Sequence, residues 1–100
     1  MKVHFAQSGG VLGLVKGCEL DTATLAPEAA RTLEQLVRTS GISASGQFFS
    51  DAARDLQQYE LTIEDGGSRI SVAFDDQNIP QAAKALLGYL KRCARPMPLT

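Results

Sequence analysis

The chain contains few of the residues that most often carry catalysis or bind a metal. Its 100 residues include one histidine, His4, and two cysteines, Cys18 and Cys93. A Ser-His-Asp or Cys-His arrangement would have to use His4, which alternates with apolar neighbours in a predicted strand, so an ordinary strand histidine is the simpler interpretation. One histidine and two cysteines far apart in sequence offer no clustered zinc ligands. The sequence therefore predicts a protein that is not an enzyme and has no cofactor or bound metal.

Long apolar runs and a strong net charge are also absent from the sequence. The formal net charge is −1, so no overall field would attract nucleic acid or an anionic membrane. No stretch approaches the roughly 20 apolar residues of a membrane-spanning helix, and the N-terminus has no apolar signal-peptide core. We therefore expect a cytoplasmic protein, with a monomer favoured, whose partner is another protein rather than nucleic acid or a membrane.

The sequence does not decide whether the cysteines pair. A chain without an export signal is expected in a reducing compartment, where disulfides are rare. Cys18 and Cys93 are therefore expected to be buried thiols rather than a disulfide, although both states stay open.

Two segments that alternate between apolar and polar residues flank a turn in the middle of the chain. Asp65, Gly66 and Gly67 suit this turn, because glycine adopts the positive φ angles of a tight hairpin and aspartate can bond the turn backbone. The pattern predicts a β-hairpin over residues 58–74. Its apolar positions are Tyr59, Leu61 and Ile63 before the turn and Ile70, Val72 and Phe74 after it.

An earlier hairpin is predicted near the N-terminus. Residues 2–8 alternate, with Val3 and Phe5 on one face, and residues 11–20 form a second, less regular apolar segment. Residues 8–10 are Ser-Gly-Gly, which breaks the strand pattern between the two segments. The pattern therefore predicts a second hairpin, in which glycines form the turn between the two strands.

Two segments have the apolar spacing of three and four residues that is typical of amphipathic helices. The first begins at Pro27 and ends near Thr39, and Gly41 suits the position just after a helix. The second is opened by residues 79–80, which are Ile-Pro, and is stopped by Pro96.

Polar segments connect these elements. Residues 42–55 have no clear period and are predicted to be a loop. Asn78 can cap the second helix. The adjacent carboxylates of residues 75–76 could attract a cation, but turn and cap chemistry is favoured because neighbouring side chains at a strand end diverge.

The predicted elements follow the order β-β-α-β-β-α. Two hairpins that each bury one face, with two helices of one apolar stripe apiece, predict an α+β fold in which a four-stranded antiparallel sheet is packed with two helices. We expect one domain over residues 1–100, of which 95–100 are a short C-terminal tail. The expected core residues are Val3, Phe5, Leu14, Leu20, Leu33, Leu36, Val37, Leu61, Ile63, Ile70, Val72, Phe74, Leu86, Leu87 and Leu90.

With catalysis disfavoured, a protein-binding surface is the candidate site. The segment from Ser8 to Leu14 places small residues beside Val11 and Leu12 at the tip of the first hairpin, and a narrow tip can enter a cleft. The same segment also suits a plain turn whose apolar residues pack inward. The candidate partner-binding residues are Ser8, Gly9, Gly10, Val11, Leu12 and Gly13 in this tip, and Asp65, Gly66 and Gly67 in the central turn.

Several sequence patterns are similar to those of a known family. They are Lys2-Val-His-Phe5, Gln7-Ser-Gly-Gly10 and Glu19-Leu-Asp21 in the first hairpin, Pro27-Glu28 and Leu33-Glu34-x-Leu36-Val37 in the first helix, and Tyr59-x-Leu61-x-Ile63-x-Asp65-Gly66-Gly67, Asp75-Asp76, Ile79-Pro80 and Leu86-Leu87-x-x-Leu90 in the second half. With these patterns the chain resembles the emfourin family of small bacterial inhibitors over nearly its whole length. Residues 43–58 depart most from the family pattern.

The resemblance implies inhibition of thermolysin-like zinc metallopeptidases of the protealysin type by a folded domain that blocks the active-site cleft. In such a complex, Gly9 and Gly10 would permit close approach of the two backbones, and Val11 or Leu12 would fill the apolar substrate pocket. The tip contains no cysteine, histidine or carboxylate, so steric occlusion is favoured over ligation of the zinc. The turn of residues 65–68 is a competing contact. A protein-interaction domain without inhibitory activity is the alternative function.

Overall fold

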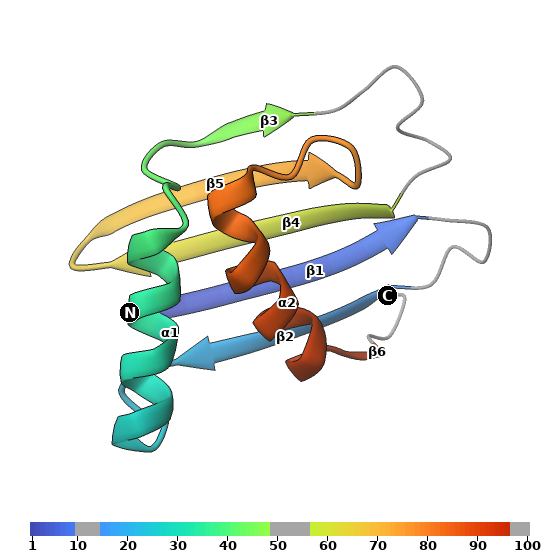
Figure 1. The fold of residues 1–100 in the computed structure, drawn as a ribbon. Helices are drawn as coiled ribbons and strands as arrows, with labels where there is room; N and C mark the ends of the chain where they lie inside the picture. Colours follow the sequence, from blue (N-terminus) through green and yellow to red (C-terminus); the bar gives the residue numbers. More distant parts are fainter. Residues whose placement is uncertain (10–14, 49–56, 97–100) are drawn as a thin grey trace.

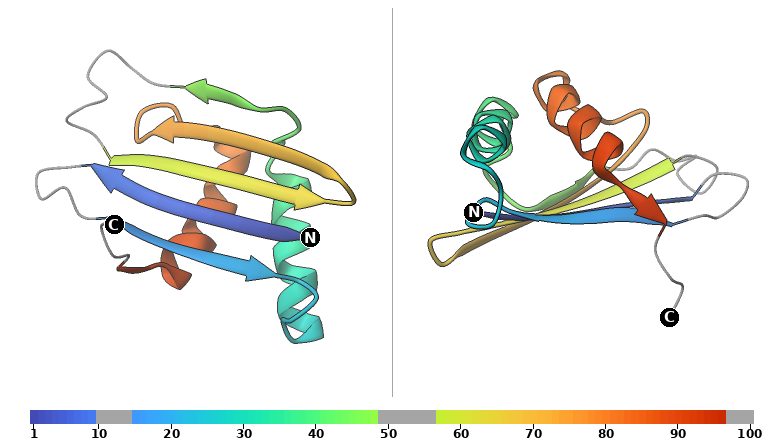
Figure 2. Two further views of the ribbon diagram at one scale, coloured as in Figure 1. Left: turned by 180° about the vertical axis from the view of Figure 1, so that it is seen from behind. Right: turned by 90° about the horizontal axis from the view of Figure 1, so that it is seen from below.

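Among the residues that the structure describes, six strands form one sheet, and two α-helices pack on one of its faces (Figures 1 and 2). The structure is a computed structural model that describes residues 1–9, 15–48 and 57–96. The strand order is β3-β5-β4-β1-β2-β6. The elements are β1 (Lys2–Gly9), β2 (Lys16–Asp21), α1 (Pro27–Thr39), β3 (Gly46–Phe48), β4 (Gln57–Asp65), β5 (Ser68–Asp75), the short 3₁₀ helix η2 (Gln81–Ala83), α2 (Lys84–Cys93) and β6 (Arg95–Pro96).

The four central strands pair as the sequence predicts. β1 lies between β2 and β4 and is antiparallel to both, and β4 is antiparallel to β5. β1 and β4 pair along their length, from Lys2 opposite Glu64 to Gly9 opposite Gln57. This pairing joins the N-terminal strands to the central hairpin. Residues 11–14, which were expected to begin the second strand, lie outside the described residues.

The prediction of a four-stranded, purely antiparallel sheet is wrong at both edges. β3 runs parallel to β5, and beside it the Ser71 N–H donates a hydrogen bond to the Ser45 hydroxyl (2.9 Å). β6 pairs with β2 and places Pro96 opposite Lys16. The sequence assigned these residues to the loop 42–55 and to the tail, because strands of three and two residues are too short to show alternation. A proline is compatible with a strand at such an edge.

α1 has the bounds that the sequence predicts. Pro27 is its first residue, and Gly41 follows the helix with a φ of 75°, the left-handed conformation that glycine often adopts at a helix C-terminus. Ser40, which lies between the last residue of α1 and Gly41, is buried. Its hydroxyl donates to the Val37 carbonyl oxygen (2.6 Å) and accepts from the Ile42 N–H (3.2 Å). The chain therefore leaves the helix in a fixed direction, toward β3.

The predicted start of the second helix is wrong by several residues. Pro80 precedes η2, and α2 begins only at Lys84. The side chain of Asn78 caps neither helix. Its amide donates to Oδ1 of Asp75 (2.8 Å), which also accepts from the Gln77 N–H (2.9 Å). The buried Asp75 carboxylate therefore holds the turn after β5, which confirms the turn chemistry predicted for it.

The core lies between the sheet and the two helices. Leu20, Leu36 and Ile70 are only partly buried at its margin, and Leu14 lies outside the described residues. Every other predicted core residue is buried, and Tyr59 and Ala83 join them although the prediction omitted both. The buried hydrophobic residues are Val3, Phe5, Leu33, Val37, Tyr59, Leu61, Ile63, Val72, Phe74, Ala83, Leu86, Leu87 and Leu90.

The other face of the sheet is turned away from both helices (Figure 2, right). It carries the polar and small side chains that alternate with the buried ones along the strands. His4 lies opposite Glu19 on one side and Thr62 on the other, at the positions that alternate with the buried ones. In the described part of the chain, no helix is long and apolar enough to cross a membrane.

Gly67 and Gly88 have open surroundings but different backbones. Gly67, in the turn between β4 and β5, has a φ of 88°, and an added Cβ there would meet no atom within 4 Å. Gly88 lies inside α2, and the nearest contact of an added Cβ would be the Arg92 guanidinium at 4.0 Å. Because neither site is crowded, the change in the free energy of unfolding caused by an alanine at either position reflects backbone preference alone.

We expect Gly67→Ala to lower the free energy of unfolding by about 1–2 kcal/mol, because an L residue is strained at that φ. We expect Gly88→Ala to raise it by about 0.5–1 kcal/mol, because alanine loses less backbone entropy in a helix. Urea unfolding of both variants and the wild type measures these changes. Two effects of the same sign would contradict the left-handed turn at Gly67.

Candidate partner-binding site

The two predicted contact tips lie at opposite ends of the sheet. β1 ends at Gly9, opposite the start of β4 at Gln57, whereas β4 ends at Asp65, beside the N-terminus (Figure 1). The eight residues of β1 separate these ends by about 25 Å at the usual strand rise. The structure therefore does not bring Ser8 and Gly9 together with residues 65–67, and the predicted residues form two separate candidate sites.

Side-chain amides fix the end of β1 onto β4 at the first of these sites. Gln7 Nε2 donates to Gln57 Oε1 (3.1 Å), and Gln57 Nε2 donates to the Gly9 carbonyl oxygen (3.4 Å). Gly9 has a φ of 94°, which L residues rarely adopt, so the backbone changes direction there. Residues 10–13 of the predicted tip lie outside the described part of the chain. The structure thus describes the base of the tip as a hydrogen-bonded pair of strand ends.

Tyr59 lies beside this base, on the covered face of the sheet, and joins three elements. Its ring stacks on that of Phe5 in β1, with centroids 6.2 Å apart and 15° between the ring planes. Its hydroxyl donates a short hydrogen bond to Oδ1 of Asp76, just after β5 (2.5 Å). The Lys91 ammonium in α2 lies 4.6 Å from the ring centroid, within cation–π range. Tyr59 therefore holds β1, the end of β5 and α2 together next to Gln57.

The surroundings of Tyr59 disfavour loss of its hydroxyl proton. The residue is 2% exposed, and burial raises the pKa of the phenol well above its usual range. The hydrogen bond to the Asp76 carboxylate and the negative charge of that group raise the pKa further. The neutral phenol is therefore the form that donates the hydrogen bond to Asp76.

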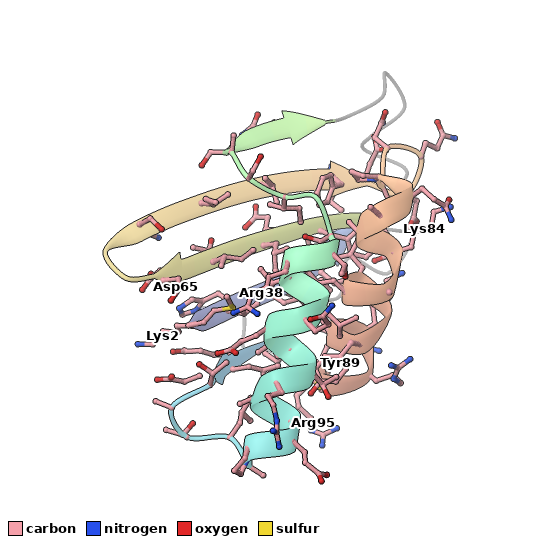
Figure 3. The ribbon with its side chains drawn as sticks, turned by 60° about the vertical axis from the view of Figure 1, so that its left-hand side comes forward. Lys2, Arg38, Asp65, Lys84, Tyr89 and Arg95 are labelled. Atoms are coloured by element: carbon pink, nitrogen blue, oxygen red, sulfur yellow. The ribbon has the colours of Figure 1, made fainter. Side chains whose placement is uncertain are left out.

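The opposite end of the sheet is a polar, exposed turn. Between Asp65 and Ser68 it contains two glycines with φ of 58° and 88°, which confirms the predicted tight turn. The Ser68 hydroxyl donates to the Asp65 carbonyl oxygen (2.8 Å), and the Asp65 carboxylate lies 3.8 Å from the N-terminal ammonium of Met1. Figure 3 shows Asp65 and Lys2 at this end. A partner bound here would meet charged and hydrogen-bonding groups.

The described residues do not gather ligands for a metal ion. No group of three or more His, Cys, Asp or Glu side chains comes together within residues 1–9, 15–48 and 57–96. His4 lies on the open face of the sheet, with its Nδ1 3.7 Å from Oε2 of Glu19. An exposed histidine beside a glutamate is explained as a surface pair, in line with the interpretation of His4 as an ordinary strand residue.

The sequence did not predict the polar contacts that support the end of the sheet at Gly9. Gln7, Gln57 and Lys91 come from three different elements. Gln7 begins the Gln7-Ser-Gly-Gly10 pattern, but neither Gln57 nor Lys91 belongs to a motif that would link it to Gly9 or Tyr59. The alternation of apolar residues did place Tyr59 on the covered face. Only strand pairing and helix packing bring its ring and hydroxyl to their partners.

A comparison with protein families finds a match over most of the chain. The family described as Emfourin matches residues 5–91. The chain belongs to the Emfourin family. Neither a curated protein nor a solved structure matches it. The Emfourin match confirms the resemblance inferred from the sequence patterns, and it spans the cluster of Phe5, Tyr59, Asp76 and Lys91. Because Emfourin is an inhibitor family, membership favours a binding role over a catalytic one.

Tyr59 and Tyr89 are the two tyrosines of the chain, so Tyr89→Phe leaves Tyr59 as the only reporter of tyrosine ionisation. A raised folded-state pKa means that Tyr59 stabilises the fold up to about pH 10 and that this contribution is lost as the pH rises further. We therefore expect tyrosinate absorbance in this variant to appear only together with unfolding, as followed by circular dichroism. The Tyr59→Phe variant is the control. A Tyr59 that ionises near pH 10 in folded protein would contradict the assigned environment.

Proposed function

We propose that the protein inhibits thermolysin-like (M4) zinc metallopeptidases of the protealysin type by placing its first hairpin tip in their active-site cleft. The observation that carries this proposal is the Emfourin family match over residues 5–91. The family name relates the chain to peptidase inhibitors of this class. A cytoplasmic location and a monomeric state stay predictions.

The end of the sheet at Gly9 suits a cleft-blocking contact better than the turn of residues 65–68. Interface hot spots are usually apolar or aromatic anchors that fill pockets. That turn and its two neighbours read Glu-Asp-Gly-Gly-Ser-Arg, which offers no apolar anchor, whereas Val11 and Leu12 follow Gly9. We assign the contact to Ser8, Gly9, Gly10, Val11, Leu12 and Gly13.

The proposed mode of inhibition is steric. Zinc in proteins is bound by cysteine, histidine and carboxylate side chains, and residues 8–14 contain none of these. Val11 or Leu12 would occupy the apolar substrate pocket, and Gly9 and Gly10 would let the two backbones approach closely. The peptidase would keep its zinc in the inhibited complex.

The described contacts at the base of the tip support this mode. The hydrogen bonds of Gln57 with Gln7 and Gly9 hold β1 on β4 before any partner binds. Tyr59 anchors the neighbouring part of β4 to β1, α2 and the turn after β5. A base that is already ordered lowers the entropic cost of binding and so favours a tight complex.

Titration of a thermolysin-like peptidase with the purified protein tests the proposal. We expect hydrolysis of a short peptide substrate to fall to the background rate at about one inhibitor per enzyme when the Kd lies well below the enzyme concentration. Elemental analysis of the isolated complex should find the zinc retained. Full activity of several M4 peptidases at micromolar excess of the protein would contradict inhibition and favour an interaction domain.

Matched substitutions at the two ends of the sheet test the location of the contact. Ser8 lies one residue before the end of β1, and Ser68 begins β5 at the opposite end. We expect Ser8→Arg to raise the inhibition constant by about tenfold or more, because a long charged side chain would clash or be desolvated at the rim of the cleft. Ser68→Arg should change it by less than about twofold. The reverse result would move the contact to the turn beside Asp65.

A further inference from the structure

Cys18 and Cys93 come from distant parts of the chain and meet at one corner of the fold. Cys18 lies in β2, and Cys93 is the last residue of α2, two positions before Arg95 in β6. β6 is antiparallel to β2, with Arg95 opposite Gly17. The residue after Gly17 and the residues before Arg95 are therefore neighbours across this edge of the sheet (Figures 1 and 2).

Two further observations place the thiols close to one another. The Cys18 Sγ lies 3.8 Å from the carbonyl oxygen of Leu90, in the turn of α2 that ends at Cys93. Burial raises the pKa of Cys18 to about 11, and electrostatic interaction with Cys93 raises it in the same direction. This electrostatic interaction agrees with the pairing of β6 with β2, which brings the end of α2 to the strand that contains Cys18. Both residues are half-buried free thiols.

The surroundings of Cys93 are cationic. Lys91 and Arg92 precede it and Arg95 follows it, and all three are exposed. The chain has no acidic residue between Gln77 and Pro96. Figure 3 shows Arg95 near the C-terminal end of α2 and Lys84 at its other end. A small disulfide that carries carboxylates is attracted to such a surface.

We propose that Cys18 and Cys93 form a dithiol site that an anionic low-molecular-weight disulfide, of the glutathione type, oxidises to an intramolecular disulfide. The thiolate of Cys93, at the end of the helix, attacks the external disulfide and releases one small thiol. The sulfur of Cys18 then attacks the Cys93 sulfur of the mixed disulfide and expels the second small thiol. Two protein thiols are oxidised, one external disulfide is reduced, and the two thiol protons end on the released small thiols.

The cross-link fastens α2 and β6 to the sheet. β6 has two residues, which pair with Lys16 and Gly17 of β2. The loop that the disulfide closes contains α1, β4 and β5, and closing so long a loop restricts the unfolded chain. The site does not depend on the proposed inhibition, so a peptidase is not needed to test it.

Incubation of the full-length, reduced protein with an excess of glutathione disulfide tests the proposal. We expect both free thiols to be lost, the intact mass to fall by two hydrogen atoms, and the melting temperature to rise by about 10 °C or more. Dithiothreitol should reverse all three changes. Proteolysis without reduction should release a linked pair of peptides that contain Cys18 and Cys93.

The single variants Cys18→Ser and Cys93→Ser are matched controls, because each leaves one thiol without its partner. Each should at most gain one glutathione and should not gain thermal stability. The proposal is overturned if the wild-type protein carries glutathione on both cysteines, forms a disulfide-linked dimer or keeps both thiols free. A disulfide between Cys18 and Cys93 that leaves the melting temperature unchanged would contradict the inference that the cross-link fastens α2 and β6 to the sheet.

Discussion

The antiparallel pairing of β1 with β4 is the contact on which the rest of the structure depends. It unites the N-terminal strands and the central hairpin in one sheet, although β4 begins at Gln57, far along the chain. It also sets Val3 opposite Ile63 and Phe5 opposite Leu61, and these four side chains are buried under the helices. An isolated hairpin is marginal in water, so neither pair of strands is expected to be stable before this contact forms.

The same pairing decides what a partner can reach. Because β1 and β4 run in opposite directions, the two glycine-bearing ends of the hairpins point away from each other, and one narrow contact can use only one of them. Side chains from β1, β4, α2 and the turn after β5 reinforce the end at Gly9. The opposite end is a tight turn of small and charged residues. The structural support and the apolar residues of the sequence therefore favour the same end for the proposed inhibitory contact.

The short strands β3 and β6 lie at the two edges of the sheet and cover the strands beside them. An exposed sheet edge presents unpaired backbone groups that can pair with another chain, and β3 and β6 each cover part of such an edge. β6 also returns the chain to β2 directly after α2 ends. This return brings the end of α2, with Cys93, to the strand that contains Cys18. The two residues of β6 therefore cover the sheet edge and also bring the proposed dithiol site together.

The sequence by itself determined the elements whose patterns extend over many residues: the central hairpin, α1, the apolar face of α2 and most of the core. In these segments each residue's local preference and its burial agree, so the pattern predicts the element without knowledge of the elements that pack against it. Tertiary structure alone decided β3 and β6, the contact of Tyr59 with Lys91, and the separation of the two tips. Each of these depends on groups that are distant in the chain, and no local pattern encodes a contact whose other half lies tens of residues away.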